Sequence, residues 1–195
     1  MSRPHVVGIG GTTRPGSSTE RALRYALRTC EEHGVTTTLF AGADLADLPH
    51  YDPELTERAP GALRLLEEIR RADGLIIGSP GYHGSVSGMV KNAIDYTEDL
   101  RDDPTRCYLT GTPVGLIATG AGWQGTITTL EALRSIVHAL RGWATPLGVA
   151  INSTMKVFND DGDVVDDKAR LQLETMAREV VEFIKLRRSA LQPTN

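Results

Sequence analysis

Residues 5–23 read HVVGIGGTTRPGSSTERAL. The stretch begins with a nearly continuous apolar run, which is typical of a strand that is covered on both faces. It ends with alanine and leucine at helical spacing, and a loop of glycines, hydroxyl side chains and one arginine lies between the two parts. A strand, a short loop and a helix in this order form the repeating unit of α/β proteins.

The same unit recurs along the chain. Apolar runs at 74–79, 113–120 and 146–151 predict three more covered strands, and the alternating run at 35–40 predicts an edge strand. Apolar residues at helical spacing lie between the strands and after them, at 19–33, 63–69, 127–140 and 180–184. We therefore expect a doubly wound α/β domain with a parallel sheet.

The composition fits one globular domain. The chain has 195 residues, of which we expect 1–190 to form the domain and 191–195 a short polar tail. A net charge of −4 gives no basic excess for binding nucleic acid. No run approaches the roughly 18 apolar residues of a membrane helix, and the N-terminal region lacks the apolar segment of a secretory signal.

The two cysteines, Cys30 and Cys107, lie far apart in different predicted elements. They form no disulfide framework, and no histidine or cysteine pair has the spacing of metal ligands. We therefore expect a cytoplasmic protein with reduced thiols and no metal site.

Three loops lie where this kind of sheet binds ligands, beyond the carboxyl ends of its strands. They span 10–19, 79–88 and 120–125, and all are rich in Gly, Ser and Thr. The first ends where a helix starts, so free backbone N–H groups and the helix dipole favour an anion there. Its side-chain donors are Thr12, Thr13, Arg14, Ser17, Ser18 and Thr19. This composition suits a phosphate, although a Ser/Thr N-cap beside a glycine turn would leave the same pattern.

Two known phosphate loops do not match. A P-loop ends in Gly-Lys-Ser/Thr, and no lysine precedes Lys91. The dinucleotide fingerprint needs a third glycine where Thr13 stands, and an acidic residue at the end of the second strand, where 39–41 read LFA. Hydroxyl side chains in place of helix-packing glycines indicate a terminal phosphate monoester, because its exposed oxygens need several donors at once.

With these loops the chain resembles the flavodoxin-like NADPH-dependent FMN reductase family. The family's first motif, roughly Gly-Ser-x-Arg-x-x-Ser-x-Asn, corresponds to 11–19. Its second motif, roughly Pro-x-Tyr-Asn-Gly-Ser-x-x-Gly-x-x-Lys-Asn-x-x-Asp, corresponds to 80–95. Thr19 and His83 stand where the family has Asn. The resemblance extends from residue 6 to about residue 165.

The resemblance implies a flavodoxin-like three-layer sandwich around a five-stranded parallel sheet in the order 2-1-3-4-5. It also implies bound FMN, with NADPH or NADH as the hydride donor. The FMN phosphate is then expected on the loop 10–19 and the isoalloxazine across 80–84, with backbone N–H groups of 120–123 near its pyrimidine side. The site residues expected in these second and third loops are Pro80, Gly81, Tyr82, His83, Gly84, Thr119, Gly120, Ala121, Gly122 and Trp123. No acid, base or nucleophile of the protein is expected, because FMN carries the hydride chemistry.

The sequence is compatible with two functions. One is an NAD(P)H-dependent FMN reductase or quinone reductase, which reduces free flavin, a quinone or another small acceptor. The other is a flavodoxin-type carrier that passes single electrons to a protein partner. A carrier usually has a strongly acidic docking face, and this chain is only mildly acidic, which favours the enzyme.

A homodimer or homotetramer is also expected. Family members that resemble this chain pair through the helices of the second motif and of 127–140. Met89, Val90, Ile94 and Tyr96 supply apolar side chains beside those of 127–140. Together these side chains supply more apolar surface than is needed to cover one face of a small sheet, which favours self-association.

Overall fold

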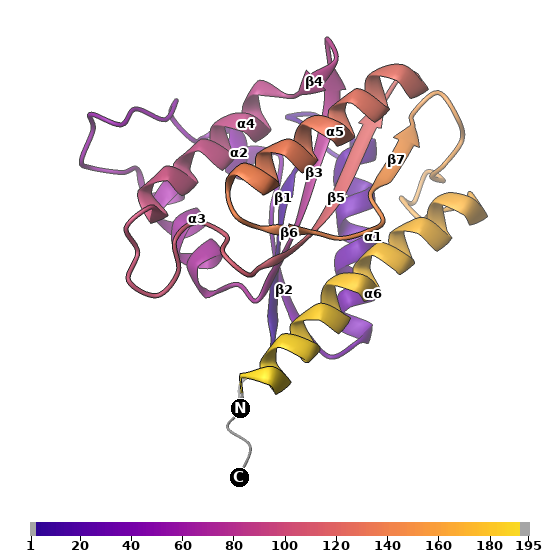
Figure 1. Cartoon of the computed structure of the whole chain (residues 1–195). Coiled ribbons are helices and arrows are strands. Elements are labelled where there is room, and N and C mark those ends of the chain that lie inside the picture. The colour runs from indigo at the N-terminus through magenta and orange to yellow at the C-terminus, as the bar shows by residue number, and fades with distance from the viewer. Residues whose placement is uncertain (1–2, 192–195) are drawn as a thin grey trace.

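The computed structural model describes residues 3–191. A parallel sheet lies between two layers of helices (Figure 1). The flavodoxin-like three-layer sandwich is therefore confirmed. Of the expected polar tail, residues 192–195 lie outside the described part of the chain.

The parallel strands follow the order β2-β1-β3-β5, and the next position is shared by β6 and β7, which both pair with β5. The strands are β1 (His5–Gly10), β2 (Thr36–Phe40), β3 (Gly74–Tyr82), β4 (Ser85–Val86), β5 (Pro113–Gly120), β6 (Trp143–Ala144) and β7 (Val149–Asn152). The predicted order 2-1-3-4-5 thus holds for the parallel strands. The short β4 is an addition that pairs antiparallel with the end of β3.

The fifth strand differs from the prediction, because it is divided into β6 and β7. Pro146 lies between the two and has no N–H to donate to a neighbouring strand. The N–H of Leu147 donates to the Glu179 carboxylate at 3.0 Å instead of to β5. The predicted strand at 146–151 therefore forms only from Val149 onward.

The helices are α1 (Ser18–Glu32), α2 (Ala43–Ala46), α3 (Pro60–Arg71), α4 (Gly88–Asp95), α5 (Trp123–Ala139) and α6 (Asp167–Ala190), with a 3₁₀ turn η1 (Tyr96–Leu100). The four predicted helical segments are confirmed in α1, α3, α5 and α6. The helix α5 begins at Trp123, earlier than the apolar spacing indicated, because its exposed first turn carries no apolar stripe. Within residues 3–191, no helix combines the length and the apolar character needed to cross a membrane.

The continuous apolar runs are divided between two cores, one on each face of the sheet. In β3, Leu75 and Ile77 pack under α3, α4 and α5, whereas Ile76 packs under α1 and α6. This alternation follows from the two-residue period of a strand and explains why no polar residue interrupts the run. Burying apolar side chains on both faces is the main source of stability for such a sheet.

One sequence argument for self-association is wrong. Val90, Ile94 and Tyr96 are buried in the core of the single chain, and Met89 packs against the same core. Val90 and Tyr96 therefore supply no free surface for a second copy, whereas Ile94 also lines a cavity beside α5.

Candidate functional site

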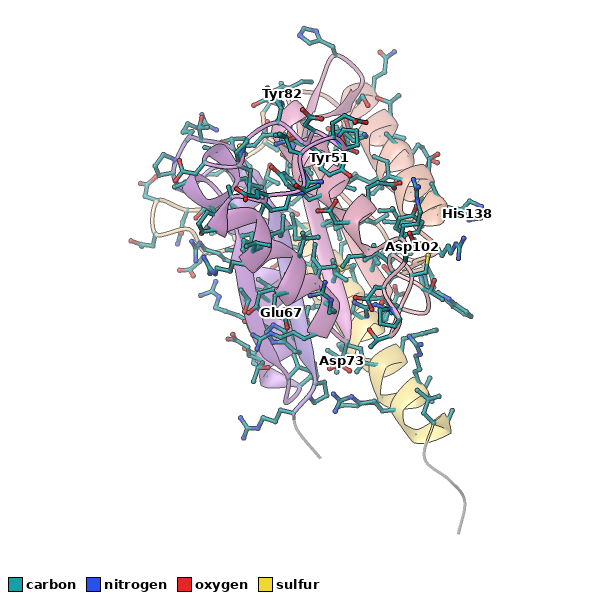
Figure 2. The ribbon with its side chains drawn as sticks, turned by 90° about the vertical axis from the view of Figure 1, so that its left-hand side faces the viewer. Tyr51, Glu67, Asp73, Tyr82, Asp102 and His138 are labelled. Atoms are coloured by element: carbon teal, nitrogen blue, oxygen red, sulfur yellow. The ribbon has the colours of Figure 1, made fainter. Side chains whose placement is uncertain are left out.

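The carboxyl edge of the sheet carries a cavity of about 270 Å³ where the three predicted loops meet. Figure 2 shows Tyr82 at this edge, and Asp73, which precedes β3, at the opposite end of the molecule. The lining consists of Thr12, Arg14, Ser17, Ser18, Thr19, Pro80, Gly81, Tyr82, Thr119, Gly120, Ala121 and Ser153. A larger cavity, of about 450 Å³, lies along α1, but no residue of the second or third loop lines it. Chemistry rather than size therefore identifies the site.

The first loop can leave β1 only through a glycine. Gly10 has φ of +146°, and a Cβ there would lie 1.8 Å from the carbonyl oxygen of Gly78 on β3. Any larger residue would push the two strands apart. The glycine thus lets the loop turn tightly above the sheet and brings its donors to the cavity.

Ser17 caps the helix at the end of this loop. Its Oγ accepts a hydrogen bond from the N–H of Glu20 at 3.3 Å. The N–H groups of Ser18 and Thr19 precede the first helical hydrogen bond and have no partner within the helix. They lie at the positive end of the helix dipole, which favours a phosphate.

Arg14 provides the positive charge of the cavity. Its side chain is exposed and forms no ion pair with any residue between 3 and 191. The backbone N–H of Arg14 donates to Thr12 Oγ1 at 3.2 Å, so the hydroxyl of Thr12 orders the turn. The guanidinium is therefore free to bind an anion, and the residues present fit a phosphate group.

Thr19 and Thr119 form a buried link under the loop. Their hydroxyl oxygens are 2.7 Å apart, and both side chains are buried. The bond ties the first turn of α1 to the end of β5. The hydroxyl of Thr19 is therefore already hydrogen-bonded within the fold. Its backbone N–H lies in the first turn of α1 and has no partner within the helix.

The second loop forms a hairpin. Tyr82 pairs with Ser85, and the two residues between them, His83 and Gly84, have φ of +52° and +82°. Two positive φ values are the requirement of a type I′ turn. Histidine tolerates this conformation better than most residues with a side chain, as asparagine does. The departure from the family's Asn-Gly thus keeps the turn.

Buried serines hold this hairpin in place. Ser79 Oγ accepts from the N–H of Ser87 at 2.9 Å and donates to the carbonyl of Pro80 at 2.9 Å. Ser87 Oγ in turn accepts from Val90 and caps α4. These bonds fix the backbone of 80–82 against the cavity.

The third loop leads into a second helix terminus. Gly120 and Ala121 line the cavity, and Gly122 precedes α5 without a side chain that could accept the first N–H groups. Trp123, the first residue of α5, has an exposed fraction of 51%. The helix terminus adds a positive partial charge beside the cavity.

Five predicted residues do not line the cavity: Thr13, His83, Gly84, Gly122 and Trp123. One lining residue, Ser153, was missed. It follows β7, and its N–H donates to the carbonyl of Gly120 at 2.8 Å. Ser153 could have been predicted from its position, because it follows the last predicted strand, whose carboxyl end lies at the same edge of the sheet.

Comparisons with known proteins agree with this geometry. A family model described as NADPH-dependent FMN reductase matches residues 4–156. An FMN-dependent NADPH-azoreductase of Staphylococcus haemolyticus is 30% identical over 185 residues, which cover 90% of this chain and 93% of the relative. An NAD(P)H-dependent FMN reductase of Pseudomonas aeruginosa is 32% identical over 170 residues, or 85% of this chain and 86% of the relative.

A solved structure shares the fold. The flavoenzyme NAD(P)H:(acceptor) oxidoreductase FerB of Paracoccus denitrificans superposes with a TM-score of 0.76 at 23% identity. The similarity covers 94% of this chain and 98% of that protein.

Proposed function

This chain belongs to the NADPH-dependent FMN reductase family, and we propose that it delivers reducing equivalents to a small acceptor, a free flavin or a quinone. FMN is its cofactor and NAD(P)H is its reducing substrate. Bound FMN supplies the hydride chemistry between NAD(P)H and the acceptor. The observation that supports the assignment is the cavity at which the three loops meet around Arg14, whose guanidinium has no ion pair within the described part of the chain.

We assign the residues of this chain to the parts of FMN as follows. Arg14, with the N–H groups of Ser18 and Thr19, holds the phosphate, because these are the cationic and helix-terminal donors of the cavity. The backbone of 80–82 and of 120–121 faces the ring edge. The five predicted residues outside the lining stay assigned to parts of FMN that project beyond the cavity.

We infer the acceptor class from the residues at the cavity. Tyr82, whose side chain is exposed, lines the cavity together with Gly81 and Gly120. A planar acceptor fits such a cavity better than a protein partner does, because a protein would need a larger complementary face. Since a relative is named an azoreductase, azo compounds are a third class of acceptor to be tested.

We also place the protein in the cytoplasm, and we propose that it is a homodimer or homotetramer. Both cysteines are free thiols, as the reducing cytoplasm would keep them.

An anaerobic reduction experiment tests the function. The purified protein with bound FMN receives NADPH, or NADH in a parallel run, and the flavin absorbance is followed. We expect the absorbance to bleach and to return when free flavin, a quinone or an azo dye is added. A flavin that stays oxidised with both nicotinamide nucleotides would identify a single-electron carrier instead.

A further inference from the structure

A second cavity, of about 400 Å³, adjoins the FMN cavity on the other side of the first loop. Arg14, Ser18 and Ser153 line both cavities. Arg21, on the first turns of α1, lines only the second one. The two spaces therefore adjoin and share part of their lining.

The second cavity is cationic. Arg14 and Arg21 are its charged lining residues, and the lining includes no carboxylate. Asp161 and Asp163 line the neighbouring groove along α1, which Arg21 also borders, and Asp163 lies 3.8 Å from Arg28. Within residues 3–191, Arg21 forms no ion pair, so its charge is not neutralised.

The guanidinium of Arg21 is held in position. Its Nη1 donates to the carbonyl of Asn159 at 2.7 Å. A Cβ on Gly16 would lie 3.6 Å from both Nε and Nη2, so the group sits directly beside the first loop. One hydrogen bond uses only part of its five N–H donors. A fixed guanidinium with unused donors suits a phosphate group.

The remaining lining is largely polar, with a small apolar part. Met155 is exposed, Phe158 is half-buried, and both border the cavity together with Val157. A thioether and an aromatic ring provide a polarizable surface for a flat base. The cavity thus offers two cations within a largely polar space, with Met155 and Phe158 at its border.

We propose that this cavity takes the adenosine 2′-phosphate end of NADPH, and that Arg21 makes the enzyme prefer NADPH to NADH. The proposal rests on the function proposed above. NADPH and NADH differ only in the 2′-phosphate, and an arginine accommodates that group in other dinucleotide-binding proteins. With Arg14 on the FMN phosphate, Arg21 gives the second phosphate a cation of its own and offsets the repulsion between the two anions.

The test compares Arg21→Gln with Arg24→Gln, both prepared with bound FMN. Glutamine at 21 retains an N–H donor for the carbonyl of Asn159 but removes the charge. Arg24 is the matched control, because it lies on the same helix, pairs with Glu20 at 2.7 Å and does not line the second cavity. Calorimetry measures the binding of 2′,5′-ADP and of ADP, which lacks the 2′-phosphate, and steady-state kinetics give the KM of NADPH and of NADH.

We expect the unaltered protein to bind 2′,5′-ADP more tightly than ADP. Arg21→Gln should weaken 2′,5′-ADP and raise the KM of NADPH by about tenfold, as expected for the loss of one charge-assisted contact. The KM of NADH, the affinity for FMN and all values of Arg24→Gln should stay unchanged.

Three results would overturn the inference. The first is equal binding of 2′,5′-ADP and ADP, and the second is an equal effect of both substitutions. The third is a parallel loss of FMN affinity in Arg21→Gln, which would assign Arg21 to the FMN phosphate. Failure of the proposed function is separate: a protein that keeps FMN but oxidises neither nucleotide refutes the reductase, while 2′,5′-ADP binding still reports on the cavity.

Discussion

Arg14 is the residue on which FMN recognition should depend most. Its guanidinium is exposed and has no partner among the described residues. Arg14→Ala removes one charge-assisted contact to the phosphate, worth about 1.5–3 kcal/mol, and should weaken FMN binding by tenfold or more. Fluorescence titration measures the dissociation constant. Riboflavin, which lacks the phosphate, is the control, and an equal loss for both ligands would contradict the assignment of this loop.

The two thiols should differ in reactivity. Cys30 is buried between α1 and α6, and burial raises the pKa of its thiol to about 12. The thiolate is the reactive form, so Cys30 stays inert near neutral pH, whereas Cys107 is only half-buried. We expect one thiol per chain to react with an aromatic disulfide reagent before unfolding and two after it. Cys107→Ser should abolish the fast reaction, and a fast reaction that survives in this variant would show that Cys30 is exposed by local opening.

The sequence predicts most of the residues that line the cavity, but it does not predict the direction of every side chain. Motif positions close to strand ends, such as Pro80 and Thr119, reach the cavity because the parallel strands end at one edge. Thr13 and Trp123 stand in the right loops but do not line the cavity, because the direction of a loop side chain depends on backbone turns that composition does not reveal. Arg21 was not predicted as a site residue, because it belongs to a helix rather than to a loop.

Among the elements, the C-terminal end of α3 is bound by the half-buried Arg106. Arg106 donates to the carbonyls of Ile69 and Arg70, to that of Ala72 at 2.8 Å, and to Thr112 Oγ1 at 2.9 Å. These carbonyls lie at the negative end of the helix dipole, where a cation is favoured. Arg106→Ala should lower the free energy of unfolding in urea by about 3 kcal/mol.

Arg178→Ala is the control for this helix prediction. Arg178 is exposed on α6, and among residues 3–191 its one side-chain hydrogen bond goes to Thr175 Oγ1, at 3.3 Å. Its removal should change the stability by less than about 0.5 kcal/mol. An Arg106→Ala protein as stable as this control would show that water replaces the arginine at the helix end.

The segment between α2 and α3 is held by an acid-sensitive contact. The guanidinium of Arg58 donates to both carboxylate oxygens of Asp99, at 2.7 and 2.8 Å, and holds the pKa of Asp99 below its usual value. The ionised form therefore stabilises the folded state. This contribution is complete above the ordinary aspartate pKa of about 3.9 and is lost as the pH falls through the lower pKa of the folded state.

Asp99→Asn tests this pH dependence. The variant should be less stable than the unaltered protein at pH 7, and it should lose less stability when the pH is lowered to about 3. Urea unfolding at both pH values measures the difference. Stability curves that stay parallel over this range would show that other carboxyl groups control the acid response.

Element boundaries were predictable where periodicity is strong and less so where a single residue decides them. The alternating and continuous runs correctly predicted β1, β2, β3 and β5. The division of the fifth strand depends on Pro146 and on the distant carboxylate of Glu179, and only the second of these is invisible in the local sequence. The hairpin at His83-Gly84 was missed because His-Gly is a weaker type I′ signal than Asn-Gly.

In the whole molecule, the outer face of α4 and α5 is the candidate surface for self-association. Val90, Ile94 and Tyr96 are buried and Met89 is half-buried, but a cavity of about 360 Å³ lies between the two helices. Its apolar lining comes from Ile94, Ile136, Ala139 and Leu140, with Lys91 and Asp95 forming an ion pair at its rim. His138 points outward from the last turn of α5 (Figure 2).

We predict that this face joins two copies around a twofold axis. A twofold interface brings the same patch of each copy together, so this apolar depression can pair with itself. Lys91, Asp95 and Glu98 border it, so the cation of one copy can meet a carboxylate of the other. Light scattering should give twice the 21.1 kDa mass of one chain, or four times that mass for a pair of dimers. Ala139 is exposed, so Ala139→Arg leaves the core intact and should shift the protein to single chains at micromolar concentration. Ala190→Arg, at the exposed end of α6, is the matched control and should not alter the mass. Single chains in the unaltered protein, or an unchanged mass in Ala139→Arg, would place the interface elsewhere or remove it.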